Sequence, residues 1–440
     1  MTFPVRHMRF AAAIALTTTF MPASSAFAQQ PLGDMPGVGP APELPSPNEA
    51  EAATKYSKVI GWPEGRTPTA PQGFQVQAFA ADLDSPRWLH VLPNGDVLVA
   101  ESTSHPKSSR SAESREGGIA GGSVGVSANR ITLLRDADGD GVAEMREPFL
   151  ENLNQPFGMT LVGDTLYVGN TDGIMRFPYE EGATRIDDPG EFILQLPGGG
   201  YNNHWTRNII ASSDGGKLYV TVGSASNAGE YGPDEEIRRA AILEINPDGS
   251  GEKLFASGLR NPNGMDWEPM TGALWTAVNE RDGLGDDLVP DYITSVREGA
   301  FYGWPYSYYG QNEDPRREGE RPDLVARAIA PDYAMGSHTA SLGLAFYDGA
   351  AFPERYRGGA FVGQRGSWNR SSFAGYQVAF VPFRDGRPSG PAEAFLTGFI
   401  ADAERGEAYG RPVGVALLPD GSLLVADDAG DTVWRVMGGP

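Results

Sequence analysis

The chain has 440 residues, and its 35 Lys and Arg against 57 Asp and Glu give a formal net charge of −22. This acidic balance argues against nucleic acid or an anionic membrane surface as the main partner, because both attract concentrated positive charge. Cysteine is absent, which excludes disulfides, thiolate nucleophiles and Cys-ligated metal sites. The 57 glycines and 35 prolines require many turns and therefore predict many short strands rather than long helices.

The first 28 residues have the features of a secretory signal peptide. Arg6 and Arg9 precede an apolar stretch over 10–21, and Ala26-Phe27-Ala28 provides a small-x-small cleavage pattern. We therefore expect a periplasmic or secreted protein. No later apolar run approaches 18 residues, so the mature chain is not expected to span a membrane.

Beyond this segment, residues 29–72 are rich in proline and predict an extended leader, and 73–440 are expected to be the folded catalytic domain. Within that domain a turn followed by an alternating strand recurs six times, at 92–102, 161–170, 212–224, 268–280, 356–366 and 418–428. The glycines of these turns suit a tight hairpin, and another strand-like run precedes each copy. Six such units predict an all-β fold, a six-bladed β-propeller with four-stranded blades, and a pair of β-sandwiches is the alternative.

Unequal spacing between the copies indicates insertions at 105–129 and 282–327. In a propeller such insertions lie at the blade rims, where loops from different blades converge on the central channel. A functional site is therefore expected there. The segment 73–79 is expected to add a strand to the last blade and so close the ring.

His204 stands just before an apolar strand that begins at Ile209, which places it at a strand entrance facing the predicted channel. Its ordinary pKa near neutrality suits a general base, although a structural histidine fits the same position. Arg260, Arg365 and Arg411 stand in glycine-rich loops beside the fourth, fifth and sixth repeats, so a ring would bring them together. Forked guanidinium groups suit a ligand with several carboxylates, although each arginine can instead pair with a surface acid.

A second pattern is the aspartate-rich loop at 136–147. Asp136, Asp138 and Asp140 alternate, Gly141 follows, and Glu147 stands at the twelfth position, as in a calcium-binding loop. An alternating strand over 130–134 precedes this loop where a helix is usual, so a hairpin that binds nothing is the alternative. A third acidic segment, 280–287, offers carbonyls and carboxylates to a metal or is only a solvated loop.

Several segments together resemble the soluble quinoprotein sugar dehydrogenases, and most closely the sorbosone dehydrogenase branch. They are His204 before its strand, GLRNPNG at 258–264, FYGWP at 301–305, SHTASLGLAFY at 337–347 and GRPVGVALLPDG at 410–421. The resemblance runs from about residue 74 to 436. It implies a six-bladed propeller that holds pyrroloquinoline quinone (PQQ) and a calcium ion (Ca²⁺) over the channel mouth. It also implies a sugar substrate and an external electron acceptor, a quinone or a cytochrome.

The resemblance implies a role for each matching position. His204 matches the base that removes the substrate hydroxyl proton, and Arg260 matches the residue that polarises the quinone carbonyl receiving hydride. The positions that match cofactor contacts, or that are expected to line the same site, are Asn261, Arg365, Arg411, His338 and Gln155. The backbone carbonyls of Arg281 and Asp282 fall near the family's calcium ligands.

This chain departs from the glucose-oxidising relatives at two positions beside the histidine. Those relatives have an acid near Ser224 and another where this chain has Asn203. The resemblance therefore predicts PQQ-dependent oxidation of a sugar, or of a sugar-derived alcohol or aldehyde of the sorbosone or aldose type. The alternatives are a calcium-dependent lactonase or esterase on a similar propeller, which leaves the arginines unexplained, and a propeller that only binds a partner.

Overall fold

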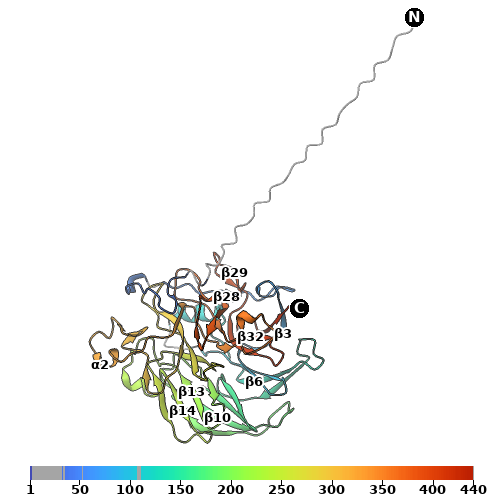
Figure 1. The fold of residues 1–440 in the computed structure, drawn as a ribbon, viewed down its shortest axis with the longest axis horizontal. Coiled ribbons are helices and arrows are strands. Elements are labelled where there is room, and N and C mark those ends of the chain that lie inside the picture. The colour runs from blue at the N-terminus through green and yellow to red at the C-terminus, as the bar shows by residue number, and fades with distance from the viewer. Residues whose placement is uncertain (2–31, 33–34, 52, 107–110, 440) are drawn as a thin grey trace. The chain divides into compact units, whose positions relative to one another are not determined.

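The computed structural model describes residues 1, 32, 35–51, 53–106 and 111–439. The predicted signal peptide, apart from Met1, lies outside these residues. Strands make up nearly all of the regular structure in the described part of the chain (Figure 1). Its helices are short: α1 (Ala112–Ala120), α2 (Pro322–Val325), η2 (Glu49–Glu51), η3 (Pro233–Glu236) and η4 (Glu354–Tyr356). None of the helices in the described ranges is long and apolar enough to cross a membrane.

Six sheets of four or five strands follow one another along the described chain. The first contains β4 (Pro86–Val91), β5 (Val97–Glu101), β6 (Arg130–Arg135) and β7 (Met145–Leu150). The second contains β8 (Met159–Val162), β9 (Thr165–Asn170), β10 (Gly173–Pro178) and β11 (Glu191–Gln195). The third contains β12 (Ile209–Ala211), β13 (Leu218–Val222), β14 (Ala241–Ile245), β15 (Lys253–Ser257) and the parallel β19 (Ala300–Phe301).

The remaining large sheets come from the second half of the chain and from two N-terminal strands. The fourth contains β16 (Pro262–Trp267), β17 (Leu274–Val278), β18 (Pro290–Ser295), β22 (Tyr333–Ser337) and β1 (Val38–Gly39). The fifth contains β23 (Ala345–Phe346), β24 (Ala360–Gln364), β25 (Gln377–Val381) and β28 (Glu393–Leu396). The sixth contains β31 (Pro412–Leu417), β32 (Leu423–Asp427), β33 (Thr432–Gly438) and β3 (Phe74–Ala80). Short ladders join β20 (Ser307–Tyr308) to β21 (Asn312–Glu313), β26 (Phe383–Arg384) to β27 (Arg387–Pro388), and β2 (Lys58–Val59) to β30 (Glu407–Ala408) and β29 (Ile400–Asp402).

Each predicted repeat turn joins the first and second strands of one large sheet. Each turn has a glycine at positive φ: Gly95 (90°), Gly163 (59°), Gly215 (68°), Gly272 (68°), Gly358 (77°) and Gly421 (83°). Residues with a Cβ rarely adopt this conformation, which explains why the turn signal recurs in the sequence. The prediction that the segment at 73–79 adds a strand to the last sheet is confirmed, because β3 pairs with β33 (Figure 1).

The first strands of the six sheets lie next to one another. In chain order β4, β8, β12, β16, β23 and β31 each contact the next, and β31 contacts β4. Glycines permit this close approach, since a Cβ on Gly343 would overlap the carbonyl oxygen of Val413, and one on Gly414 would press on that of Arg87. We call these six strands the inner strands.

The hydrophobic core is divided among the spaces between neighbouring sheets. Trp88, Phe149 and Phe157 belong to a buried cluster between the first and second sheets, and Phe361 and Trp434 to one between the fifth and sixth. Each sheet therefore buries both faces against its neighbours, which explains why its strands are apolar on both sides.

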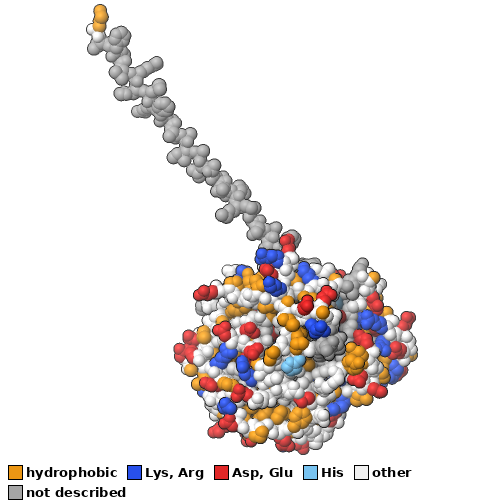
Figure 2. Space-filling model, turned by 180° about the vertical axis from the view of Figure 1, so that it is seen from behind, with side chains coloured by type: hydrophobic (Ala, Val, Ile, Leu, Met, Phe, Trp, Pro, Cys, Tyr) orange, Lys and Arg blue, Asp and Glu red, His pale blue; other side chains and the backbone are white. Residues whose placement is uncertain are grey.

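The described part of the proline-rich leader runs along these sheets. β1 pairs with β22, and β2 pairs with β30. The Trp62 ring packs against Phe399, Tyr409 and Trp434, and its indole N–H donates to Asp427 at 2.7 Å. On the face in Figure 2, acidic and basic side chains are interspersed.

Candidate functional site

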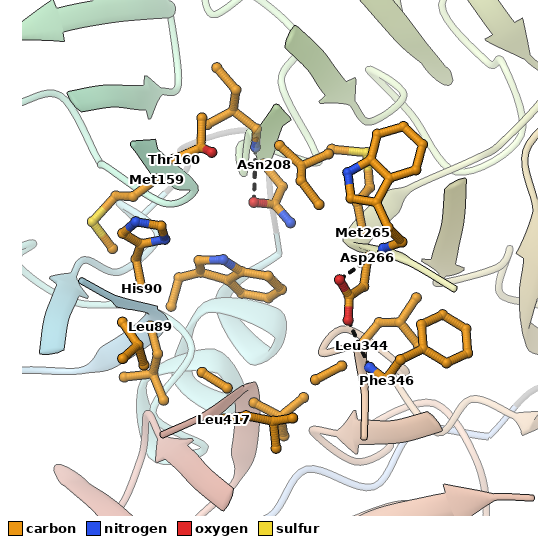
Figure 3. Close-up of a pocket in the computed structure, with 18 of the residues that line it drawn as sticks. Leu89, His90, Met159, Thr160, Asn208, Met265, Asp266, Leu344, Phe346 and Leu417 are labelled. Carbon is orange, nitrogen blue, oxygen red and sulfur yellow. Dashed lines mark hydrogen bonds between the residues drawn. The ribbon is translucent and has the colours of Figure 1, made fainter. Parts of the chain in front are cut away.

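The inner strands run in the same direction between two cavities. Residues before or at their N-terminal ends, including Arg87, Asn261 and Arg411, line a cavity of about 190 Å³. Residues toward their C-terminal ends line a second cavity of about 360 Å³, which includes His90 and Asp266 (Figure 3). We call the first the arginine cavity and the second the far cavity.

The arginine cavity brings together four of the residues that the sequence analysis singled out. They are His204, Asn261, Arg365 and Arg411. They come from segments that are far apart in the chain, and each stands before or at an inner strand or at the end of a neighbouring one. The side-chain oxygen Oδ1 of Asn261 is buried and has no hydrogen-bond partner among the described residues, so it remains available to a ligand.

Three buried arginines line this cavity, and two of them share one carboxylate. Arg87 and Arg365 both form ion pairs with Asp428, the latter at 2.7 Å. Arg411 donates instead to the carbonyl oxygens of Arg365 (3.0 Å) and Gly366 (2.6 Å). Burial, reinforced by repulsion from Arg365, lowers the pKa of Arg87 and of Arg411 to about 10, so both stay protonated at neutral pH. The wall therefore carries surplus positive charge and favours an anionic ligand.

The segment after α1 lies against two of these arginines. Arg365 donates to Ser123 Oγ at 2.9 Å, and Arg411 donates to the Gly121 carbonyl at 3.1 Å. Ser114 and Gly118 of α1 line the same cavity. The insertion at 105–129, which the sequence placed at the blade rims, thus contributes to the site through its described residues.

His204 lines the arginine cavity, and hydrogen bonds to a neighbouring segment hold its ring. Its Nδ1 lies 3.0 Å from the carbonyl oxygen and 2.9 Å from Oγ of Ser224. Arg207 donates to the His204 carbonyl at 2.8 Å and fixes the backbone at this residue. The ring is thus placed by the segment before β12 and by the segment after β13.

Arg260 is buried one residue before Asn261, and protein acceptors surround its guanidinium. Nε and Nη2 donate to the carbonyl oxygen and to Oδ1 of Asn227, at 3.1 and 2.8 Å. Nη1 donates to the carbonyls of Glu280 at 2.6 Å and Asn279 at 3.2 Å, and Nη2 also donates to the Asp282 carboxylate at 3.2 Å. Five hydrogen bonds leave this side chain little freedom to rotate. Asn227, which the sequence analysis missed, is the residue that fixes Arg260.

The two carbonyls predicted near a calcium ion have different surroundings. The carbonyl oxygen of Asp282 accepts from Asn227 Nδ2 at 2.9 Å and from Arg281 Nη1 at 2.8 Å. That oxygen therefore faces a guanidinium, an unfavourable neighbour for a metal ion. The carbonyl of Arg281 accepts no hydrogen bond from the described residues and is the more suitable ligand of the two. The Arg281 side chain itself forms a buried ion pair with Asp314 at 2.6 Å.

His338 and Gln155, which were expected to line the cofactor site, lie in other surroundings. The Nε2 of His338 is 2.9 Å from the Gly285 carbonyl, and its Nδ1 is 2.8 Å from Asn369 Nδ2. Gln155 donates to the Thr103 carbonyl at 2.7 Å. Both side chains are buried, and the structure does not bring them to the wall of the arginine cavity.

The aspartate-rich loop forms the hairpin between β6 and β7, away from the arginine cavity. The carboxylates of Asp136, Asp138, Asp140 and Glu144 lie within 4.8 Å of one another. Glu147 is outside this group, because it already belongs to β7 and faces Leu133 across the ladder. The structure thus supplies a fourth carboxylate, but three residues earlier than the sequence spacing predicted.

Comparison with known proteins fits this geometry. The model for glucose and sorbosone dehydrogenases matches residues 83–367. The chain belongs to the glucose/sorbosone dehydrogenase family. A model described as TrAA12-like matches residues 316–438. An uncharacterised protein of Borreliella burgdorferi is 31% identical over 296 residues, which cover 65% of this chain and 76% of the relative.

Two better described relatives are more distant. The aldose sugar dehydrogenase of Escherichia coli is 26% identical over 210 residues, 44% of this chain and 53% of the relative. The holo form of the pyranose dehydrogenase PQQ domain from Coprinopsis cinerea superposes with a TM-score of 0.68 at 19% identity, covering 87% of this chain and 100% of that domain. This second likeness concerns the fold.

The sequence analysis missed Arg87 and its partner Asp428. Arg87 lies inside an apolar run, without the glycine-rich loop that marks the other arginines. A signal was nevertheless present, because Arg87, Arg260 and Arg411 all stand next to or near a proline where an inner strand begins.

Proposed function

We propose that this member of the family is a quinoprotein that oxidises a sugar, or a sugar-derived alcohol or aldehyde of the sorbosone or aldose type, with PQQ as the hydride acceptor. The observation that carries the proposal is the trio Arg87, Arg365 and Arg411 in the cavity that His204 also lines, where Asp428 pairs with only two of the three arginines. Buried charge is unfavourable unless it is neutralised. PQQ has three carboxyl groups, so it matches a wall with surplus cations.

The chain's own residues then take distinct roles. Arg87, Arg365 and Arg411 hold carboxylates of the cofactor, and the unpartnered Oδ1 of Asn261 accepts a further hydrogen bond. His204 takes the proton of the substrate hydroxyl, which makes the adjacent C–H a better hydride donor. PQQ, when bound, supplies the two-electron chemistry that no side chain of this protein provides.

Two further assignments concern the calcium site and Arg260. The rigid guanidinium of Arg260, one residue from Asn261, stabilises negative charge that develops on the cofactor. The carbonyl of Arg281 is the proposed ligand of the cofactor's Ca²⁺. Ligation by Asp282 as well requires Asn227 and Arg281 to release its carbonyl.

We also infer that the six sheets are the blades of a six-bladed propeller. Contact between inner strands in ring order and the pairing of β3 with β33 support this arrangement. Residues 73–440 then form the catalytic domain, 29–72 a leader whose described strands pair with it, and 1–28 a cleaved signal peptide. Export to the periplasm or the medium places the electron acceptor, a quinone or a cytochrome, outside the cytoplasm.

The decisive experiment is calorimetric titration of the mature apoprotein with PQQ in the presence of Ca²⁺, followed by dye reduction across a panel of sugars. Saturable binding with sugar-dependent reduction supports the proposal. Arg411→Gln should weaken quinone binding by about 1.5–3 kcal/mol, the range for a charge-assisted hydrogen bond, whereas Arg405→Gln on the surface should not. Absence of quinone binding refutes the proposal, and lactone hydrolysis or glycan binding would then be assayed.

A further inference from the structure

One short segment, residues 224–226, holds the imidazole ring of His204. The Nδ1 atom lies within hydrogen-bond distance of two oxygens of Ser224, its carbonyl and its Oγ. A carbonyl oxygen can only accept. The hydroxyl of Ser224 donates its single hydrogen to the Ser226 carbonyl at 2.6 Å, so toward the ring it also acts as an acceptor.

Two acceptors at one ring nitrogen determine where the proton of a neutral imidazole resides. Nδ1 must carry the hydrogen, and Nε2 must carry the lone pair. A ring in the opposite tautomer would place the Nδ1 lone pair against two oxygens and leave Nε2 unable to accept a proton. The neighbours of Nδ1 therefore decide whether His204 can act as a base.

The segment is itself fixed from two sides. Ala225 N–H donates to Glu236 Oε2 at 2.8 Å, and Ser226 Oγ donates to Glu236 Oε1 at 2.7 Å, so the carboxylate at the end of η3 holds both residues. On the other side Ser224 N–H donates to the Arg260 carbonyl at 2.8 Å. Ser224 and Ser226 are almost fully buried, so water does not compete for these bonds.

We propose that Ser224 and Glu236 are positioning residues for the oxidation: Ser224 fixes the His204 tautomer with a basic Nε2, and Glu236 keeps Ser224 in place. The proposal rests on the assignment of His204 as the base. It assigns a function to a carboxylate that touches neither the ring nor the cavity wall. Because Ser224 also bonds to the Arg260 carbonyl, one buried residue sets the spacing between the proposed base and Arg260.

The test measures the tautomer directly, by long-range ¹H–¹⁵N correlation spectra of the mature protein labelled at histidine. We expect the His204 signals of the unmodified protein, identified by their loss in His204→Asn, to show a protonated Nδ1 and an unprotonated Nε2. Glu236→Gln replaces one accepting oxygen by a donor and should shift the ring toward the Nε2–H tautomer. Glu235→Gln changes the exposed neighbouring acid and should leave the spectrum unchanged.

Kinetics of the quinone-loaded protein provide a second readout. Glu236→Gln should lower kcat about tenfold or more, up to the 10²–10⁴-fold that complete loss of a base produces, while KM and quinone affinity stay within about twofold. If Glu236→Gln does not fold, Ser226→Ala removes one of the two bonds to Glu236 and should change both readouts in the same direction.

The outcomes separate this inference from the proposed function. A protonated Nε2 in the unmodified protein, or an unchanged tautomer in Glu236→Gln and Ser226→Ala, overturns the positioning roles even if the protein oxidises sugars. The expected spectra in a protein that binds no quinone support the positioning of the ring and refute the proposed function instead.

Discussion

Asp428 is the side chain whose replacement tests the charge balance of the arginine cavity most directly. Its carboxylate is 1% exposed and pairs with both Arg87 and Arg365, while Oδ1 is buried and has no hydrogen-bond partner within the described part of the chain. Asp428→Asn preserves the shape and leaves the buried guanidinium groups of Arg87 and Arg365 without their counter-charge. Removing one partner of a buried ion pair costs about 3–5 kcal/mol. Over the 410 residues of the folded unit, an unfolding entropy of ~2.1 cal/mol/K per residue converts this loss to a Tm lower by about 4–6 °C.

The same substitution should strengthen the response to an anionic cofactor. The cavity of Asp428→Asn has one more net positive charge, so saturating quinone should raise the Tm of this variant by more than it raises the Tm of the unmodified protein. For the unmodified protein, quinone at 100 times its Kd should increase the free energy of unfolding by about 2.7 kcal/mol. Differential scanning fluorimetry with and without PQQ measures both effects. Asp323→Asn, in the exposed pair with Arg321, is the matched control and should change neither. A Tm for Asp428→Asn equal to that of the unmodified protein, or a smaller gain with quinone, refutes the reasoning.

Three further predictions concern other parts of the fold. If the β6–β7 hairpin binds calcium, Glu144→Gln should abolish any rise of Tm with added Ca²⁺ and Glu147→Gln should not, because only Glu144 belongs to the carboxylate group. If each variant has the same Tm in EDTA and in Ca²⁺, the hairpin binds no calcium. Gly343→Ala should destabilise the fold because the added Cβ overlaps the backbone of the next inner strand. Gly199→Ala, which has open space around it, should unfold at nearly the same urea concentration as the unmodified protein. Burial raises the pKa of Asp266 to about 7, so the folded state keeps a proton that the unfolded chain releases near pH 4; stability should fall as pH rises from about 4 to 7, and Asp266→Asn should remove that part of the slope of Tm against pH.

The sheets could be predicted from sequence because their signals are local. A glycine at positive φ and residues that alternate with period two lie within about ten residues of one another, and both features recur at each hairpin. The strand at 74–80 was also predictable, since a ring of repeats needs a strand to complete its last sheet. The contacts of the leader were not predictable, because β1 and β2 are only two residues long and pair with strands about 300 and about 350 residues away.

The site was predictable only where a residue stands in a recognisable local sequence pattern. Arg365 and Arg411 stand in glycine-rich loops, and His204 precedes a strand, so these residues can be recognised from the sequence. Arg87 lies inside a strand-like run, and its partner Asp428 is 341 residues away, a contact that only folding creates.

Two expectations differ from the structure for reasons that lie in the backbone. His338 has a positive φ of 63°, and its ring turns to the Gly285 carbonyl instead of the cavity. The calcium pattern counted twelve positions as though a helix followed the loop. A strand follows instead, which directs Glu147 into the ladder and leaves Glu144 in the turn.

The two ends of the inner strands show why arginine is the residue type that fits the proposed cofactor. In the far cavity burial lowers the pKa of His90 to about 4 and raises that of Asp266 to about 7, so burial moves both groups toward their neutral forms (Figure 3). Similar burial at the other end brings Arg87 and Arg411 only to about 10. A histidine there would be neutral at pH 7, and a lysine would begin from a pKa about two units lower than arginine. A wall that must stay cationic while buried, and that must meet planar carboxylates with two donors each, therefore requires guanidinium groups.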